Sequence, residues 1–220
     1  MRESTSGENS STSLRIAVVG AGWMGGSVGK AWVRAGHEVM FSSRHPERLG
    51  KNFGHLGKNA KVGSVGDALL FADIVLLTLP YASLPALAGE FGSLFAGKLV
   101  LDAANPSSDL TSQFAADAFA RGVGVTTQQL FPGAVVVRAF SCVDAMEVDS
   151  SSHRASQRLA VPVAGDDSTA VARAEHLVRD AGCEPLVVGG LAAASRFERG
   201  TQAFRANTTL ARLKSLLKIA

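Results

Sequence analysis

Cysteine is scarce in this chain, and the two cysteines present form no motif. Cys142 and Cys183 lie far apart in a sequence of 220 residues, with no C-x-x-C spacing. This usage predicts neither a disulfide framework nor a zinc site, and it fits a reducing compartment. The five histidines also lack the spacing of metal ligands. We therefore expect two buried packing thiols and no metal.

Long apolar runs are also missing. No window approaches the roughly 18 uninterrupted apolar residues that a membrane helix requires. Residues 1–13 are rich in Ser, Thr and Glu and contain no apolar stretch of the kind found in a secretory signal, so they are predicted to form a disordered tail. The sequence predicts a soluble, cytoplasmic protein without a membrane partner.

The chain has little excess charge of either sign. Its 22 lysines and arginines against 19 acidic residues give a net charge of +3. The basic residues are scattered and have no interleaved aromatics, so no nucleic-acid partner is predicted. With 46% apolar residues the chain can fill a real core. We expect the partner to be a small molecule.

What the sequence does contain is a glycine-rich loop directly after an apolar run. Residues 14–19 are predicted to form a strand, and the loop that follows consists of Gly20, Ala21, Gly22, Trp23, Met24 and Gly25. A G-x-G-x-x-G motif between a strand and a helix is typical of dinucleotide binding. The first glycine makes the tight turn, the second lets the backbone approach a pyrophosphate, and the third lets the helix pack close to the strand. For Trp23 two roles stay open, shielding of the pyrophosphate or packing on the sheet edge.

The end of the second predicted strand indicates which dinucleotide binds. NAD sites place Asp or Glu there, about 20 residues after the first glycine, to bind the ribose 2′-OH. This chain instead has Ser42, Ser43 and Arg44, with Arg48 one turn further along. Hydroxyl and guanidinium groups bind a 2′-phosphate, which a carboxylate would repel, so NADP is the predicted cofactor. The alternative is that both arginines are solvated surface charges.

Apolar runs and helical segments alternate through the rest of the chain. Continuous runs such as residues 74–77 are typical of strands buried on both faces, so we predict an α/β fold, a Rossmann-type doubly wound parallel sheet with a small C-terminal extension. His37 is expected to make a structural hydrogen bond where a strand begins. A loop is expected at residues 150–153. Further strands are expected at residues 73–79, 98–103, 134–137, 159–164 and 185–188, and helices at residues 65–71, 83–95, 107–130 (interrupted near 122–124) and 168–181.

Three parts follow from this pattern: the tail at residues 1–13, an NADP-binding Rossmann domain at residues 14–140, and a C-terminal part at residues 141–220. The last part is expected to complete the sheet and the acceptor site. It ends in a basic amphipathic helix, predicted for residues 204–219, whose leucines form an apolar stripe. That stripe could pack on its own domain, on a second copy or on a lipid surface, and the first two are favoured, so a homodimer is predicted.

The ordered set of motifs resembles the coenzyme F420-dependent NADP oxidoreductases over nearly all of residues 14–200. Each motif alone is weak, and their order makes the set specific. The segments that carry the resemblance are residues 20–25, 36–39, 42–44, 79–81, 102–106, 131–134, 136–140, 161–167 and 191–198.

The resemblance implies where the ligands lie. NADP would lie over residues 21–24, with its 2′-phosphate held by Ser43, Arg44 and Arg48, and coenzyme F420 would be the second substrate. The residues implied to line the cofactor toward the nicotinamide are Leu79, Ser83, Asn105 and Ala145.

Two of these segments also follow strands directly, and the carboxyl ends of strands are where open α/β sheets bind ligands. They are Leu79, Pro80 and Tyr81 after one strand, and Asn105 and Pro106 after the next. Their prolines end the strand ladder and fix the backbone, although prolines also end strands where no ligand binds. Hydride transfer between two bound rings depends on positioning, so no catalytic acid or base is predicted.

The chain departs from the family where the second substrate is expected. Ser141 and Cys142 stand where many relatives have Asn or His, and a short basic helix replaces a longer C-terminal stretch. An NADPH-dependent reductase with a flavin or another acceptor is therefore one alternative, and a non-catalytic NADPH sensor is another. A G-x-S-x-G spelling around Ser27, with Asp102 and His153 or His176 later in the chain, suggests a serine hydrolase, but the serine is expected inside a helix and not at the turn that a nucleophile requires.

Overall fold

The centre of the molecule is one sheet of eight strands in the order β3-β2-β1-β4-β5-β6-β7-β8. The computed structural model describes residues 13–107 and 112–220, so the predicted tail lies outside the described residues except for Ser13. The strands are β1 (Arg15–Val19), β2 (Glu38–Ser42), β3 (Ala60–Gly63), β4 (Ile74–Leu77), β5 (Leu99–Asp102), β6 (Val135–Arg138), β7 (Ala160–Gly165) and β8 (Glu184–Gly189).

The pairing of β6 with β7 is antiparallel, and all other neighbouring strands are parallel. The predicted doubly wound parallel sheet is therefore confirmed, with an antiparallel exception at this one pair. Only Val137 with Gly165 and Arg138 with Ala164 are in register, so β7 begins beyond the carboxyl end of β6 and runs back to it. An antiparallel neighbour needs no crossover, and the connecting residues 139–159 stay on the carboxyl side of the sheet.

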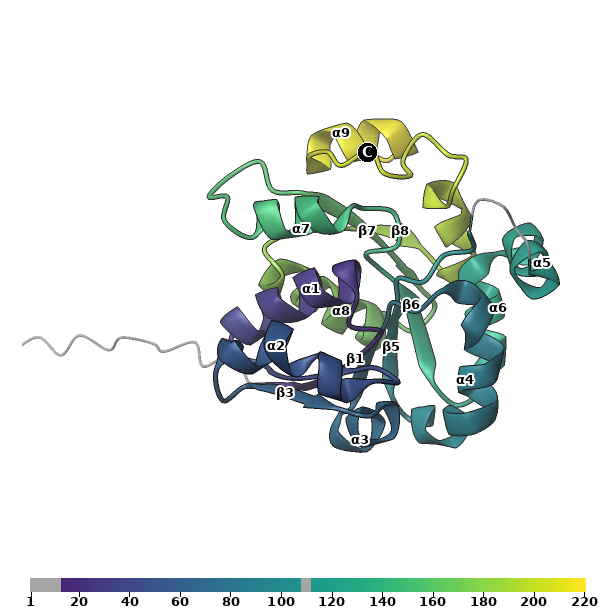
Figure 1. The fold of residues 1–220 in the computed structure, drawn as a ribbon. Helices are drawn as coiled ribbons and strands as arrows, with labels where there is room; N and C mark the ends of the chain where they lie inside the picture. The colour runs from purple at the N-terminus through teal and green to yellow at the C-terminus, as the bar shows by residue number, and fades with distance from the viewer. Residues whose placement is uncertain (1–12, 108–111) are drawn as a thin grey trace, which may run out of the picture.

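Helices cover both faces of this sheet (Figure 1). Successive strand residues point to opposite faces, so Ile16 and Val18 belong to one core cluster while Ala17 and Val19 belong to the other. The first cluster packs under α1, α7 and α8, and the second under α3 to α6. The helices are α1 (Trp23–Arg34), α2 (Gly50–Phe53), α3 (Val65–Phe71), α4 (Leu84–Phe91), α5 (Gln113–Arg121), α6 (Val123–Leu130), α7 (Ala145–Ser151), α8 (Ser168–Asp180) and α9 (Leu210–Leu217).

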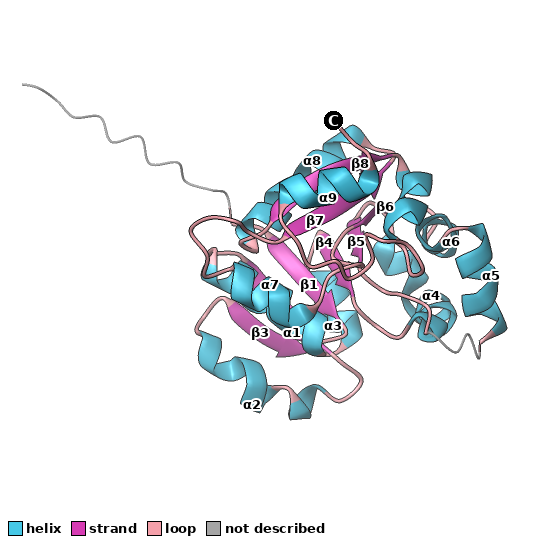
Figure 2. Ribbon diagram, turned by 90° about the horizontal axis from the view of Figure 1, so that it is seen from above, coloured by secondary structure: helices cyan, strands magenta, loops and turns pink. Residues whose placement is uncertain are grey.

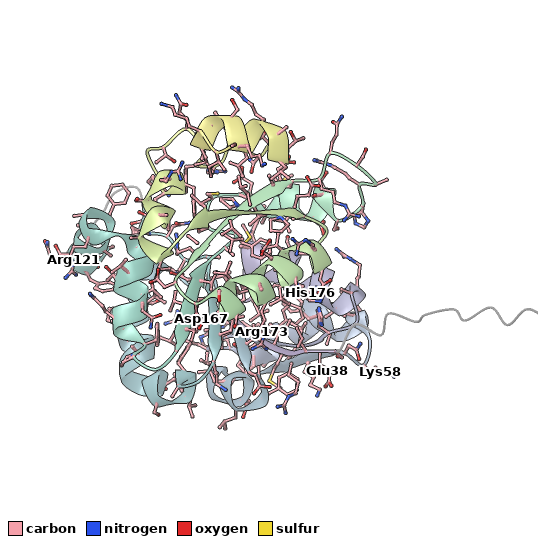
Figure 3. All side chains as sticks on the ribbon, turned by 180° about the vertical axis from the view of Figure 1, so that it is seen from behind. Glu38, Lys58, Arg121, Asp167, Arg173 and His176 are labelled. Atoms are coloured by element: carbon pink, nitrogen blue, oxygen red, sulfur yellow. The ribbon has the colours of Figure 1, made fainter. Side chains whose placement is uncertain are left out.

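Several predicted helices are confirmed, and local signals explain their limits. Helix α3 matches its prediction because Ser64 and Asp67 form a capping box at its start. Helix α8 begins after Asp167, whose carboxylate accepts a hydrogen bond from the Ala170 amide, and Asp167, Arg173 and His176 mark its course in Figure 3. The long helical prediction splits at Gly122, whose φ of +103° ends α5 before α6 begins. Residues 108–111 of that prediction lie outside the described part.

Two predictions near the C-terminal part were wrong in extent. Helix α7 continues through Ser150 and Ser151, where a loop was expected, because the Ser151 hydroxyl donates to the Gly182 carbonyl and is itself buried. Helix α9 is shorter than predicted, since Arg205 and Asn207 have positive φ angles that a helix cannot contain.

The apolar stripe of α9 is used within its own chain. Leu213 and Leu217 are buried, and the helix lies against β7 and β8, as Figure 2 shows from above. Packing on its own domain, one of the three arrangements considered, is confirmed, and the stripe no longer supports a homodimer. His37 also behaves as predicted, since its ring accepts from the Leu14 amide and bonds to Asp180 at 2.9 Å.

Candidate site beside the glycine-rich loop

The three motif glycines occupy three different environments. Gly20 has a φ of +102°, which a glycine adopts without strain. A Cβ on Gly25 would lie 2.3 Å from the Gly20 carbonyl oxygen, so no side chain fits between helix α1 and strand β1. A Cβ on Gly22 would meet nothing within 4 Å. Turn formation by Gly20 and close packing by Gly25 are thus confirmed, and Gly22 leaves open space at the surface.

Among the described residues, no side chain caps the start of α1. Its N-cap residue Gly22 provides no side-chain cap, and the first turn contains no acidic residue. The first amides of a helix lack intrahelical partners and carry the positive end of the dipole, so this end is suited to an anion. The loop is held in place from behind, because the Thr78 hydroxyl donates to the Gly20 carbonyl at 2.5 Å. The geometry fits a pyrophosphate.

The end of β2 contributes fewer groups than the sequence suggested. Ser42 is fully buried and its hydroxyl donates to the Val18 carbonyl, so its side chain supports the sheet. The Ser43 hydroxyl accepts from the His45 amide. Arg44 is exposed without a hydrogen bond or ion pair to another described residue, and Arg48 is 76% exposed with only Glu47 nearby at 3.7 Å. Both guanidinium groups are available to a phosphate.

The residues after β4 divide between the loop and the core. The Leu79 side chain comes within 3.1 Å of a Cβ placed on Gly20, so it borders the glycine-rich loop. Tyr81 is buried and donates to the Val123 carbonyl at 3.0 Å, and burial raises the pKa of its phenol well above the usual value. The Ser83 hydroxyl donates to the Pro80 carbonyl, which fixes this turn. Tyr81 is therefore a packing residue and does not face a ligand.

A buried ion pair fixes the segment after β5, and the sequence analysis missed it. Arg138 and Asp102 are fully buried and 3.0 Å apart at paired positions of β6 and β5. Arg138 also donates to the Ala104 carbonyl and to Oδ1 of Asn105, whose amide nitrogen donates to the Ser141 carbonyl at 2.6 Å. The hydrogen bonds of the Asn105 side chain thus link the ends of β5 and β6. The signal available in the sequence was that an acidic residue, Asp102, ends one apolar run and a basic residue, Arg138, ends the next strand.

The C-terminal segment fixes the start of α7, where Ala145 lies. The Asp144 carboxylate accepts from the Arg205 guanidinium and from the Asn207 amide, each at 2.6 Å. Burial raises the pKa of Asp144, but these hydrogen bonds outweigh it and lower the pKa below its usual value. Arg205 and Asn207 both have positive φ, and such strained residues persist only where the surroundings hold them. Residues 205–207 therefore determine where Ala145 stands.

A pocket of about 570 Å³ opens beside the loop, with α1 as its floor and α2 and α7 as its walls. Both views place α1 between α7 and α2 (Figures 1 and 2). Of the predicted site residues, the pocket brings together Ala21, Gly22, Trp23 and Ala145. Trp23 is 81% exposed, so it does not pack on the sheet edge. The lining residues that sequence reasoning missed are Gly26, Ser27, Lys30, Lys51, Asn52, Phe53, His55, Met146 and Asp149.

The arrangement does not support a serine hydrolase. Ser27 lies in the second turn of α1, and Asp102 is occupied by Arg138. Cys142 and Cys183 are buried, as expected, and burial raises the pKa of each thiol to about 12. Within residues 13–107 and 112–220 no group of three or more His, Cys, Asp or Glu side chains could hold a metal. No helix in this part of the chain has the length and apolar character to cross a membrane.

Known proteins are similar to this chain in sequence and in fold. The family model described as "NADP oxidoreductase coenzyme F420-dependent" matches residues 15–106. The hypothetical protein SMa0349 from Sinorhizobium meliloti is 26% identical, with a TM-score of 0.77 over 90% of this chain and 95% of that chain. A protein from Arthrobacter sp. FB24, provisionally described as an F420-dependent NADP reductase, is 23% identical, with a TM-score of 0.69 over 83% of this chain and 87% of that chain. An imine reductase from Pseudomonas sp. is 16% identical, with a TM-score of 0.60 over 83% of this chain and 57% of that chain. At these identities the last two structures show a shared fold.

Proposed function

We propose, from the match of residues 15–106 to the family model of the coenzyme F420-dependent NADP oxidoreductases, that this chain transfers hydride between NADP(H) and coenzyme F420 or a related acceptor. The observation that carries the proposal is the uncapped start of α1. There Gly22 leaves open space at unpartnered amides, at the carboxyl edge of the sheet where such folds bind dinucleotides.

The choice of NADP over NAD rests on the end of β2. Residues 42–44 include no carboxylate, Arg44 forms no ion pair with another described residue, and Arg48 is exposed with the Glu47 carboxylate 3.7 Å away. A 2′-phosphate would receive two guanidinium groups and the Ser43 hydroxyl, and charged donors of this kind bind phosphate strongly. Ser42 is left out of this set because its hydroxyl is used inside the sheet.

The chain's own residues have a positioning role in this reaction. Bound NADPH supplies a hydride, which is one proton with two electrons, and the acceptor takes it up. Arg138, Asp102 and Asn105 hold the ends of β5 and β6 in fixed positions, while residues 205–207 fix the start of α7. Fixed walls of this kind align two rings without an acid or a base.

The test is to mix the purified protein with NADPH and oxidised coenzyme F420 and to follow the deazaflavin absorbance. NADH and FMN serve as parallel controls. Loss of the absorbance with NADPH and not with NADH supports the proposal. NADPH binding without any turnover contradicts it and favours an NADPH sensor, and turnover with FMN alone favours a flavin reductase.

Homodimer formation and a cytoplasmic location stay predictions of the sequence. Size-exclusion chromatography with light scattering tests the first of these directly, with the monomer mass of 22.8 kDa as the reference.

A further inference from the structure

A second acid lies beside the buried pair of Arg138 and Asp102. Glu198 follows the 3₁₀ helix Leu191–Phe197 and is only 6% exposed. Its Oε1 accepts a hydrogen bond from the Val123 amide at 3.1 Å, and the charges of Arg138 and Asp102 both act on its carboxyl. These three residues, two acids and one arginine, form a buried charge cluster.

Glu198 and Arg138 meet at the first turn of helix α6. Val123 is the first residue of this helix, and its amide is the one that donates to Glu198. The next residue, Gly124, packs against Arg138 so closely that a Cβ on it would lie 2.7 Å from Cγ of the arginine. Tyr81 reaches the same turn, because its hydroxyl donates to the Val123 carbonyl. The turn therefore brings the acid, the arginine and the phenol together.

The buried charge cluster is neutral only when it holds one proton. With every group ionised it would carry one net negative charge, and an uncompensated buried charge is strongly unfavourable. Asp102 is the better satisfied acid, because it lies 3.0 Å from Arg138 and also accepts from the Ala104 amide. Burial raises the pKa of the Glu198 carboxyl, and this outweighs the opposite effect of the Arg138 charge. The proton therefore belongs to Glu198.

The other ionisable groups nearby do not take over the role of this proton. The Tyr81 phenol stays neutral, because burial raises its pKa well above the usual value. Arg199 lies over the Phe204 ring, 5.0 Å from its centroid, and Arg196 donates to a backbone carbonyl of helix α9. The sequence of α6 contains no ionisable side chain. Glu198 is therefore the group through which the charge of the cluster responds to pH.

Arg138 connects the cluster to the turn after β5. Its guanidinium donates to the Ala104 carbonyl at 2.6 Å and to Oδ1 of Asn105 at 2.9 Å. Its Nε is buried and has no hydrogen-bond partner among the described residues. An ionised Glu198 would attract this N–H, since hydrogen bonds between charged groups are about twice as strong as neutral ones. Rotation of the guanidinium toward Glu198 would weaken both bonds to the turn.

We propose that Glu198 is a positioning residue whose proton keeps the turn after β5 in place for the nicotinamide end of NADP(H). While Glu198 is protonated, Arg138 stays bonded to the turn, and when the carboxyl loses its proton to solvent, Arg138 turns toward it. This inference rests on the proposed NADP-dependent function, because Asn105 is among the residues expected to line the cofactor. NADPH binding is then linked to the uptake of up to one proton.

Calorimetry tests this linkage. NADPH is titrated into the protein from acidic to alkaline pH, in pairs of buffers with different ionisation enthalpies, which gives the affinity and the number of protons exchanged. The wild-type affinity should fall by up to about tenfold per pH unit above the pKa of Glu198. Glu198→Gln keeps a neutral side chain at this place, so it should match wild type at acidic pH and lose this fall. The 2′-phosphate also titrates, but equally in both proteins, so their difference is the readout.

Glu90→Gln is the matched control. Glu90 is an exposed glutamate of helix α4, so its substitution removes one negative charge without touching the cluster. Its pH profile should follow that of wild type. Equal profiles for wild type and Glu198→Gln, or an equal change in both glutamate variants, would overturn the inference. If Glu198→Gln does not fold, the sign of the wild-type proton exchange decides, because phosphate binding by arginines releases protons whereas Glu198 takes one up.

A measurement without nucleotide separates the inference from the proposed function. In nitrogen-15-labelled protein, the side-chain amide resonances of Asn105 are assigned from their loss in Asn105→Asp. They should shift with pH in wild type and not in Glu198→Gln, and the same behaviour in both proteins would overturn the inference whatever NADPH does. If the resonances behave as expected and NADPH binds at no pH, the proposed function is wrong and the link between Glu198 and the turn stands.

Discussion

Replacing Gly25 by alanine tests the close approach of helix α1 to strand β1. The added Cβ would lie 2.3 Å from the Gly20 carbonyl oxygen and 2.7 Å from the Thr78 hydroxyl. The carbonyl oxygen belongs to the backbone and is itself hydrogen-bonded to Thr78, so it cannot yield as a flexible side chain would. Overpacking of this kind costs typically 1–3 kcal/mol, and we take about 3 kcal/mol for a backbone neighbour.

Part of this cost is recovered, because alanine favours a helix over glycine by about 1 kcal/mol. The expected net loss in the free energy of unfolding is therefore about 2 kcal/mol. For a chain of this size that corresponds to a lowering of Tm by roughly 4–8 °C. Thermal unfolding followed by circular dichroism measures the change directly.

Gly22→Ala is the matched control, since it adds the same methyl three positions away. Gly22 has a φ of −80° and a Cβ there meets nothing, so its stability should change by no more than about 0.5 kcal/mol. The methyl would instead stand where the pyrophosphate is expected, and NADPH affinity should fall about tenfold, or about 1.4 kcal/mol. A Gly25→Ala protein that melts within 1 °C of wild type (roughly 0.25–0.5 kcal/mol) would refute the packing argument. Unchanged NADPH binding by Gly22→Ala would refute the placement of the phosphates.

Three further changes probe separate parts of the site. Combined Arg44→Ala and Arg48→Ala substitutions should weaken NADPH about tenfold and leave NADH unchanged in calorimetry, and equal losses for both nucleotides would show that the arginines do not bind the 2′-phosphate. Arg138→Met leaves Asp102 buried without its partner and should cost about 3–5 kcal/mol in urea unfolding, whereas a loss below about 1 kcal/mol would contradict a structural ion pair. Burial raises the pKa of Glu198, so its carboxyl stays protonated to a higher pH in the folded state than in the unfolded state. The free energy of unfolding therefore falls as the pH rises from the pKa of Glu198 in the unfolded state to its pKa in the folded state. Glu198→Gln should abolish that fall in Tm measured across acidic pH, and parallel curves for the two proteins would contradict it.

Features with a local cause could be predicted from the sequence. The run of four apolar residues in β4 is buried on both faces, and α3 begins and ends where its capping box and apolar spacing place it. The roles of Gly20 and Gly25 could also be predicted, because the motif places one glycine at the tight turn and another where the helix packs against the strand.

Features that depend on distant residues could not be predicted in this way. The pairing of Arg138 with Asp102 joins two strands, and although a charge ends each apolar run, nothing near either residue in the sequence shows that the two meet. Helix α7 has only seven residues, many of them small and polar, so its periodicity is too short to recognise. Tyr81 is buried in the core because its hydroxyl donates a hydrogen bond to α6, which is distant in the sequence.

The reversal of β7 connects these missed features to the site. An apolar run does not indicate the direction of its strand, so the sequence predicts a parallel β7. A parallel strand would require residues 139–159 to cross to the amino edge of the sheet, which would take α7 away from the glycine-rich loop. Because β7 runs back instead, α7 stays at the carboxyl edge and brings Ala145 and Met146 opposite Trp23. The departure from the predicted topology thus builds one wall of the pocket beside the glycine-rich loop.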